Sequence, residues 1–184
     1  INSNADFCQN CPPGLVCRGD DMVVPVVINS TWVVQGAVYK LMTCPRGYSR
    51  RSIEDGNADQ QRCVECAAGT ECVLEVCNNH TCSDCQAGTY KDGAGTHGCR
   101  ACPQNTFNPD IKATAFAQCQ PCMVKATTVG DGHISMDACE CQRDHYPITS
   151  SAGTVSESRM CEVCPRRPNV LCLIIGHFPD HECA

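Results

Sequence analysis

Apolar residues are unevenly distributed along this chain. A Val-rich run occupies residues 22–34, interrupted by Pro25 and by the polar tripeptide at 29–31, and a shorter run occupies residues 170–175. Val, Ile, Trp and Tyr are typical of β-strands, so we predict that residues 21–43 form a Val-rich β-hairpin or two edge strands. No segment has the 3.6-residue periodicity of an amphipathic helix.

Two roles are open to this Val-rich insert. It can pack as a small sheet on the first cysteine motif, or it can present an edge strand that pairs with another molecule. An isolated hairpin is only marginally stable, which favours the packing role. Pro25 places the first run at an edge or a bulge, because proline cannot donate to a strand ladder. The run at 170–175 is a short strand or a cap, and it is a contact surface if it is exposed.

Outside these runs the chain follows the spacing of its cysteines. Eight of them recur at steps of 19, 19, 17, 20, 20, 22 and 22 residues: Cys44, Cys63, Cys82, Cys99, Cys119, Cys139, Cys161 and Cys183. Most of them open a C-x-x-C pair. A fixed period indicates a repeat architecture in which each unit contacts mainly its neighbours. We therefore expect a small disulfide-rich fold, an elongated ladder of β-turn and short-hairpin repeats with little or no helix.

The spacing divides the chain into four segments. Residues 1–20 form an N-terminal cysteine knuckle, 21–43 the hairpin insert, 44–164 the tandem repeats, and 165–184 a C-terminal cap or the start of a further repeat. Several repeats carry Gly or Pro just after the cysteine pair and then Thr or Tyr. We expect Gly to supply a tight turn with positive φ, and the aromatic ring to pack flat on the disulfide below.

Composition explains why such repeats need covalent links. The chain has 184 residues, of which 20 are Cys, and its aromatic residues are one Trp, four Tyr and four Phe. No repeat can bury a sizeable core, and small domains without a core depend on staples. A disulfide contributes roughly 2–4 kcal/mol, mostly by restricting the unfolded chain. The net charge of −6 argues against nucleic-acid binding, which needs a basic patch.

The cysteine spacing alone is compatible with zinc as well as with disulfides. The zinc-ribbon template C-x2-C-x16-C-x2-C is matched by Cys99, Cys102, Cys119 and Cys122. Disulfides are favoured because the pairs continue without a break and lack the basic and aromatic residues of nucleic-acid zinc modules. Two N-glycosylation sequons, at Asn29 and Asn79, add to this. We therefore expect an extracellular, secreted or cell-surface glycoprotein without a metal.

A disulfide connectivity follows from taking the cysteines in consecutive order. It yields nine local bridges: Cys11–Cys17, Cys44–Cys63, Cys66–Cys72, Cys77–Cys82, Cys85–Cys99, Cys102–Cys119, Cys122–Cys139, Cys141–Cys161 and Cys164–Cys172. Bridges within a C-x-x-C are strained and redox-active, which is why each second cysteine is paired forward. A nested alternative, Cys66–Cys82 around Cys72–Cys77, is equally buildable. A Cys164–Cys183 variant would leave Cys172 unpaired.

The consecutive order leaves Cys8 and Cys183 unpaired, one near each end. Either they pair with cysteines outside this segment, or the register is wrong near one end, or they join neighbouring molecules head to tail. Cys183 also looks like the first half of another C-x-x-C interrupted at Ala184. This favours a segment of something longer or a linkable terminus.

Other short motifs carry weaker signals. Arg18-Gly19-Asp20 spells the integrin-binding tripeptide. His177 and His181 stand four residues apart, but solvated loop histidines are more common than metal ligands. Residues 55–59 resemble the opening of an EF-hand loop, whose required Gly and Glu are missing. No Ser/His/Asp order, phosphate loop or carboxylate pair stands out, so we expect no enzyme and no cofactor.

Residues 82–164 resemble a known family. Gly88-Thr89-Tyr90 match a G-T-Y after a knuckle, and Asn105-Thr106-Phe107 follow Cys102-Pro103 as in a C-P-x-x-S/T-aromatic unit. The pair at 139–141, followed by Asp144-His145-Tyr146, matches C-x-C-x-x-G-Y-Y with Asp in place of Gly. This pattern is similar to the ephrin-receptor-like cysteine-rich repeats, with tumour-necrosis-factor-receptor modules as more distant relatives.

The resemblance implies a ladder of β-turns and disulfides, with bridges from each second cysteine to the next first one. It also implies an extracellular module without catalysis. It does not identify a ligand, because such repeats serve as receptor stalks, binding modules and structural rods alike.

Three functional classes remain. The leading expectation is a structural building block of an extracellular fibre, coat or surface appendage that self-assembles head to tail through its ends and the Val-rich insert. The alternative is a ligand-binding extracellular module of a receptor or adhesion protein, and the third is an intracellular multi-zinc scaffold. The expected partners are further copies of the chain or another extracellular protein, with N-linked glycans. No membrane span is expected, because residues 22–34 are too short and too polar.

Overall fold

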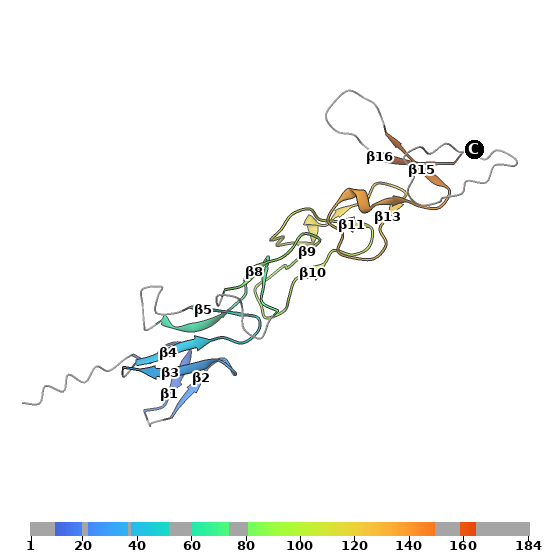
Figure 1. Cartoon of the computed structure of the whole chain (residues 1–184). Coiled ribbons are helices and arrows are strands. Elements are labelled where there is room, and N and C mark those ends of the chain that lie inside the picture. Colours follow the sequence, from blue (N-terminus) through green and yellow to red (C-terminus); the bar gives the residue numbers. More distant parts are fainter. Residues whose placement is uncertain are drawn as a thin grey trace, which may run out of the picture. The chain divides into compact units, whose positions relative to one another are not determined.

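The computed structural model of the chain describes residues 10–19, 22–36, 38–51, 60–73, 81–149 and 159–164. Its strands form two-stranded antiparallel sheets (Figure 1). Helix in the described part is confined to short 3-10 turns, among them η4 (Phe116–Gln118) and η5 (Met136–Ala138). The expected class is therefore confirmed: a small, disulfide-rich fold of short hairpin repeats.

The chain divides into two compact units. The first comprises Ile1–Cys85 with Lys91–Cys99, and the second comprises Gln86–Tyr90 with Arg100–Ala184. The first unit contains the Val-rich insert and the earlier repeats, and the second contains the later repeats.

The Val-rich insert forms its hairpin at a different place from the one its two runs suggest. β1 (Leu15–Cys17) pairs with β2 (Val23–Pro25), and β3 (Thr31–Gln35) pairs with β4 (Val38–Thr43). The first run therefore pairs back onto the cysteine knuckle, and the second run folds on itself. The reason is the two-residue connection after Gln35, where Gly36 has a φ of 60°, as tight hairpin turns require.

A buried glutamine joins this insert to the repeats. The Gln61 side chain donates from Nε2 to the carbonyl of Tyr39 and accepts at Oε1 from the N–H of Leu41, both at 2.8 Å. The Gln61 backbone carbonyl accepts from the N–H of Gly14 at 3.0 Å. Gly14 also lies against Trp32, since a Cβ on this glycine would come within 2.6 Å of the indole Cζ2. The insert thus has the packing role expected from its sequence.

The remaining strands form one hairpin per repeat. These hairpins are β5 (Tyr48–Arg51) with β6 (Arg62–Glu65), β7 (Thr70–Glu71) with β8 (Ser83–Asp84), β9 (Thr89–Tyr90) with β10 (Arg100–Ala101), β11 (Thr106–Phe107) with β12 (Gln120–Pro121), β13 (Ala126–Thr127) with β14 (Glu140–Cys141), and β15 (His145–Thr149) with β16 (Arg159–Val163). Most of the strands are only two residues long, so each hairpin buries few side chains.

One turn recurs at the start of each of these six hairpins. The third residue after Cys44, Cys66, Cys85, Cys102, Cys122 and Cys141 has a positive φ: Gly47 85°, Gly69 71°, Gly88 79°, Asn105 70°, Lys125 65° and Asp144 67°. The next N–H donates back to the carbonyl three residues earlier at 3.0–3.2 Å. A positive φ at the third position alone marks a type II turn, which favours Gly or Asn. Asp144 therefore keeps the turn although it departs from the Gly of the family pattern.

Lys125 occupies this left-handed position with an exposed side chain. A non-glycine residue there costs roughly 1–2 kcal/mol, so we expect Lys125→Gly to raise the free energy of unfolding by about 0.5–1 kcal/mol in urea titrations with the disulfides intact. Val124→Gly, at the exposed neighbouring position outside the positive-φ region, should lower it by about as much through chain entropy. The same sign of change in both variants would contradict this account of the turn.

Seven disulfides link described cysteines. Six are pairs from the consecutive order: Cys11–Cys17, Cys44–Cys63, Cys85–Cys99, Cys102–Cys119, Cys122–Cys139 and Cys141–Cys161. The seventh is Cys66–Cys82. The predicted pairs Cys66–Cys72 and Cys77–Cys82 are therefore wrong, and the outer bond is that of the nested alternative.

The strand register explains the Cys66–Cys82 bond. β7 and β8 pair Glu71 with Ser83, which brings Cys66 and Cys82 to a Cα separation of 5.7 Å, within the range of a relaxed disulfide. Cys72 is also disulfide-bonded and is buried directly after β7. The other predicted partners, Cys8, Cys77, Cys172 and Cys183, lie outside the described residues.

Candidate interaction surface

Four successive repeats have a buried position three residues after the turn. The position is occupied by Cys72, Lys91, Asn108 and Thr128 in successive repeats, and all four are buried. Each accepts a hydrogen bond from the turn N–H of the preceding hairpin: Gly47 to the Cys72 carbonyl at 3.1 Å, Gly69 to the Lys91 carbonyl at 3.0 Å, Gly88 to the Asn108 carbonyl at 2.8 Å, and Asn105 to the Thr128 Oγ1 at 3.0 Å. This position locks one hairpin to the next.

Two of these side chains also donate hydrogen bonds to the preceding hairpin, and Lys91 donates a further one to its own loop. Lys91 Nζ donates to the carbonyls of Cys66, Thr70 and Gly95 at 3.1, 2.9 and 2.7 Å. Asn108 Nδ2 donates to the Thr89 carbonyl at 3.3 Å. This role was not predicted from the sequence, because neither the residue type nor its distance from the turn shows that the side chain is buried. The buried side chains of Lys91, Asn108 and Thr128 therefore all take part in internal hydrogen bonds.

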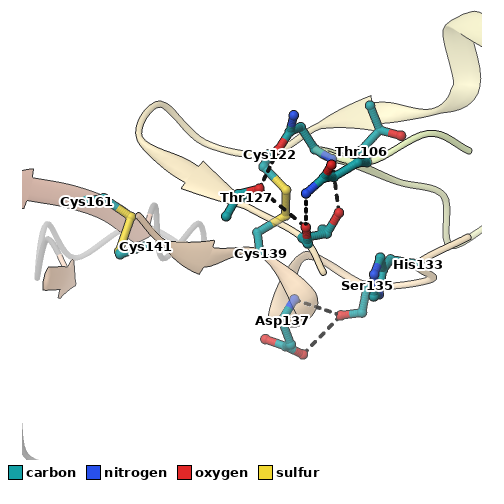
Figure 2. Close-up of a disulfide and its surroundings, with 12 residues drawn as sticks. Thr106, Cys122, Thr127, His133, Ser135, Asp137, Cys139, Cys141 and Cys161 are labelled. Atoms are coloured by element: carbon teal, nitrogen blue, oxygen red, sulfur yellow. Dashed lines mark hydrogen bonds between the residues drawn. A yellow bond between two sulfur atoms is a disulfide. The ribbon is translucent and has the colours of Figure 1, made fainter. Parts of the chain in front are cut away.

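The aromatic rings pack in two ways. Phe107 is buried in a cluster with the Cys122–Cys139 disulfide, which Figure 2 shows in close-up. Tyr90 instead meets Phe116 edge-on, with ring centroids 5.8 Å apart at 64°. The expectation that an aromatic ring packs on a disulfide thus holds for Phe107. Tyr90 instead packs against Phe116, which comes from the loop between β11 and β12.

The motifs singled out for chemistry receive little support. Within the described ranges no group of three or more His, Cys, Asp or Glu side chains is placed to hold a metal ion. Arg18 and Gly19 are exposed, whereas Asp20, residues 55–59, His177 and His181 lie outside the described residues. Among the residues placed by the structure, no helix has the length and apolar character needed to cross a membrane.

Exposed apolar side chains occur in both units. In the first unit they are concentrated on β1, β2 and β3 and their connections: Val16, Met22, Val24, Val26, Ile28, Val33 and Val34. In the second unit Met160 and Val163 lie on β16, and the others lie in loops and 3-10 turns: Ile111, Phe116, Val124, Val129, Ile134 and Met136. Val124 and Val129 are each 81 % exposed. Exposed apolar groups on a fold without a large core are candidates for protein contacts.

Residues 76–119 match the family model of the tyrosine-protein kinase ephrin type A/B receptor-like domain. This part of the chain is an ephrin-receptor-like cysteine-rich repeat. The resemblance found from the sequence is thereby confirmed over residues 82–119. The family model does not cover the repeats that begin at Cys44, Cys122 and Cys141, which share the same turn and a similar disulfide loop.

Two relatives place the repeat in large modular proteins. The chain is 31 % identical over 78 residues to cysteine repeat modular protein A of Toxoplasma gondii, which is 41 % of this chain and 2 % of that protein. It is 30 % identical over 118 residues to the sushi, von Willebrand factor type A, EGF and pentraxin domain-containing protein 1 of Mus musculus, 58 % of this chain and 3 % of that protein. The chain thus corresponds to a small part of either relative.

The disulfides, the family and the relatives agree on the general character of the chain. It is a cysteine-rich module of extracellular type that resembles the modules of receptors and repeat proteins. Its surroundings are accordingly extracellular or at the cell surface, where disulfides persist.

Proposed function

We propose that this chain is a protein-binding extracellular module, without enzymatic activity, of a larger receptor or adhesion-type protein. The observation that carries the proposal is that the groups that stabilise the repeats and the side chains exposed on their surface are two different sets. Disulfides, turn amides and the buried Lys91, Asn108 and Thr128 stabilise the hairpins internally. Large apolar side chains such as Val124 and Val129 lie exposed on the second unit, where a partner can contact them.

A surface-binding experiment tests this function. The secreted full chain, fluorescently labelled, should bind saturably to trypsin-sensitive sites on cells that display neighbouring extracellular proteins. Val124→Glu with Val129→Glu should weaken that binding by about tenfold or more, because charge on exposed apolar contacts costs about 1.4 kcal/mol or more. Val16→Glu, at an exposed position of the first unit, is the matched control. Absence of saturable binding, or equal loss in both variants, would refute the proposed surface.

N-linked glycans at Asn29 and Asn79 belong to the same proposal. Asn29 is exposed in a turn with a φ of 67°, and Thr31 two residues later is also exposed, so the sequon is accessible. Asn79 lies outside the described residues.

Self-assembly into a fibre or coat is the second candidate function. The observation that favours it is the group of exposed Val side chains on β1, β2 and β3. Head-to-tail links through Cys8 and Cys183 stay a prediction, because both cysteines lie outside the described residues.

A further inference from the structure

Among the described residues, the outer edge of β4 is hydrogen-bonded to a side chain, whereas the outer edge of β3 is not paired with another strand. On β4 the Gln61 side chain bonds the outward carbonyl of Tyr39 and the outward N–H of Leu41. Residues of an antiparallel pair alternate between bonding the partner strand and pointing away from it. Tyr39 is opposite Val34 and Leu41 is opposite Trp32, so the outward backbone groups of β3 belong to Trp32 and Val34.

The open edge of β3 lacks the features that usually protect an edge strand. Its sequence, TWVVQ, contains no charged residue and no proline. Four of its five residues are exposed, including Val33 at 43 % and Val34 at 63 %. In the part of the chain that the structure describes, β3 pairs only with β4. The register shifts between Thr31 and Trp32, but residues 32–35 pair with β4 without a further break. Such an edge is a template for a further strand.

The sequence of β3 is complementary to itself in an antiparallel arrangement centred on Val33. Trp32 then faces Val34 of the second chain, and Val34 faces Trp32. Both members of each pair direct their backbone groups outward, so each pair exchanges two hydrogen bonds. Aromatic and β-branched residues facing each other add to the stability of a sheet. Asn29 falls beyond the five paired residues, so a glycan there leaves the edge open.

We propose that β3 pairs with β3 of a second copy of this chain and forms a four-stranded sheet in the order β4-β3-β3-β4. The contact is twofold symmetric and closes after two chains. A second copy is the occupant that the edge fits, because it supplies an uncharged strand whose outward groups match in register. This inference goes beyond the proposed partner binding and uses a different unit from the Val124 and Val129 loops.

Sedimentation velocity on the secreted full chain, over a range of concentrations, tests the pairing. A concentration-dependent, non-covalent dimer is expected. Hydrogen exchange should show that the amides of Trp32 and Val34 become protected as the dimer forms. The amide of Val33 already bonds β4 and should change little. This readout uses the unmodified chain and therefore does not depend on any variant folding.

Two substitutions at one position sharpen the test. Val34→Lys places a charge on the edge, and Val34→Pro removes the outward N–H without touching the bonds between β3 and β4. Each should raise the dimer dissociation constant by about tenfold or more, since both symmetric cross-strand pairs are lost. Val24→Lys, on the exposed face of β2, is the matched control and should leave the constant unchanged.

The proposal is overturned by a chain that stays monomeric, by a dimer that neither Val34 variant weakens, or by a dimer that only reductant dissolves. The last result would assign the contact to intermolecular disulfides such as those of Cys8 or Cys183. Cell-surface binding by Val34→Lys is measured in parallel. Its persistence separates failure of the strand pairing from failure of the proposed partner binding.

Discussion

Gly88→Ala is expected to lower the stability of the surrounding repeats by about 2–5 kcal/mol, the range of combined overpacking and backbone strain. A Cβ on Gly88 would lie 2.2 Å from the carbonyl oxygen of Gly132 and 2.8 Å from its carbonyl carbon. These are backbone atoms, so no side-chain rotation relieves the clash. Gly88 also has a φ of +79°, where any Cβ is strained. The two backbone segments can approach this closely only with glycine at position 88.

Gly130→Ala separates the cost of the steric clash at Gly88 from the cost of backbone strain. Gly130 has a similar φ of +86° in the same unit, but a Cβ there would meet nothing within 4 Å. Its substitution should therefore cost only the backbone strain, about 1 kcal/mol. Native-state hydrogen exchange of the Cys102 and Gly132 amides measures the difference, because they donate to the carbonyls of Gly88 and Cys102 at 2.8 and 2.7 Å. Equal effects of the two substitutions would show that the close approach is unimportant.

Lys91→Met should destabilise the first unit by about 2–4 kcal/mol, because it leaves buried carbonyl oxygens without donors. Methionine fills a similar volume, so the loss reports the hydrogen bonds to Cys66, Thr70 and Gly95 more than a cavity. Trp32 lies in the same unit and is the only Trp of the chain, so its fluorescence in urea titrations reports the unfolding. Lys125→Met, at an exposed position, is the control and should change stability by less than about 0.5 kcal/mol.

The stability difference between wild type and Lys91→Met should depend on pH with a definite sign. Burial lowers the pKa of Lys91 below its usual value of 10.5, against the opposing effect of Glu71 and Glu65. Between the lowered folded pKa and 10.5 the unfolded chain binds more protons than the folded chain, so folded stability rises with pH there. The stability advantage of wild type over Lys91→Met should grow as the pH rises through this interval. A constant or shrinking advantage would mean that burial does not penalise the charged ammonium.

The cysteine ladder was largely readable from the sequence, and its one failure has a geometric cause. Six of the bonds join cysteines that follow one another along the chain, so consecutive order predicted them. Cys72 and Cys77 lie between Cys66 and Cys82. Both the two short loops of the consecutive order and the long loop of the nested alternative can be closed by disulfides. The choice was made by the register of β7 and β8, which sequence reasoning does not contain.

The Val-rich insert shows a second limit. Its composition indicated strands, which are present as β2, β3 and β4. Composition does not say which strand pairs with which. The positive φ of Gly36 placed the tight turn inside the second run, and the first run then paired with β1, an element outside the predicted insert.

The sequence by itself determined the repeat architecture, the disulfide chemistry and the turn after each cysteine pair, because these depend on local spacing and on residues such as Gly69 and Asn105. Only the tertiary structure decided that Lys91 is buried, that Gln61 covers the outer edge of β4, and that no other described strand pairs with the outer edge of β3. Each of these depends on which backbone groups of distant segments meet, and neither residue type nor spacing specifies that. A lysine in a polar, cysteine-rich chain gives no local sign that three carbonyl oxygens will surround it.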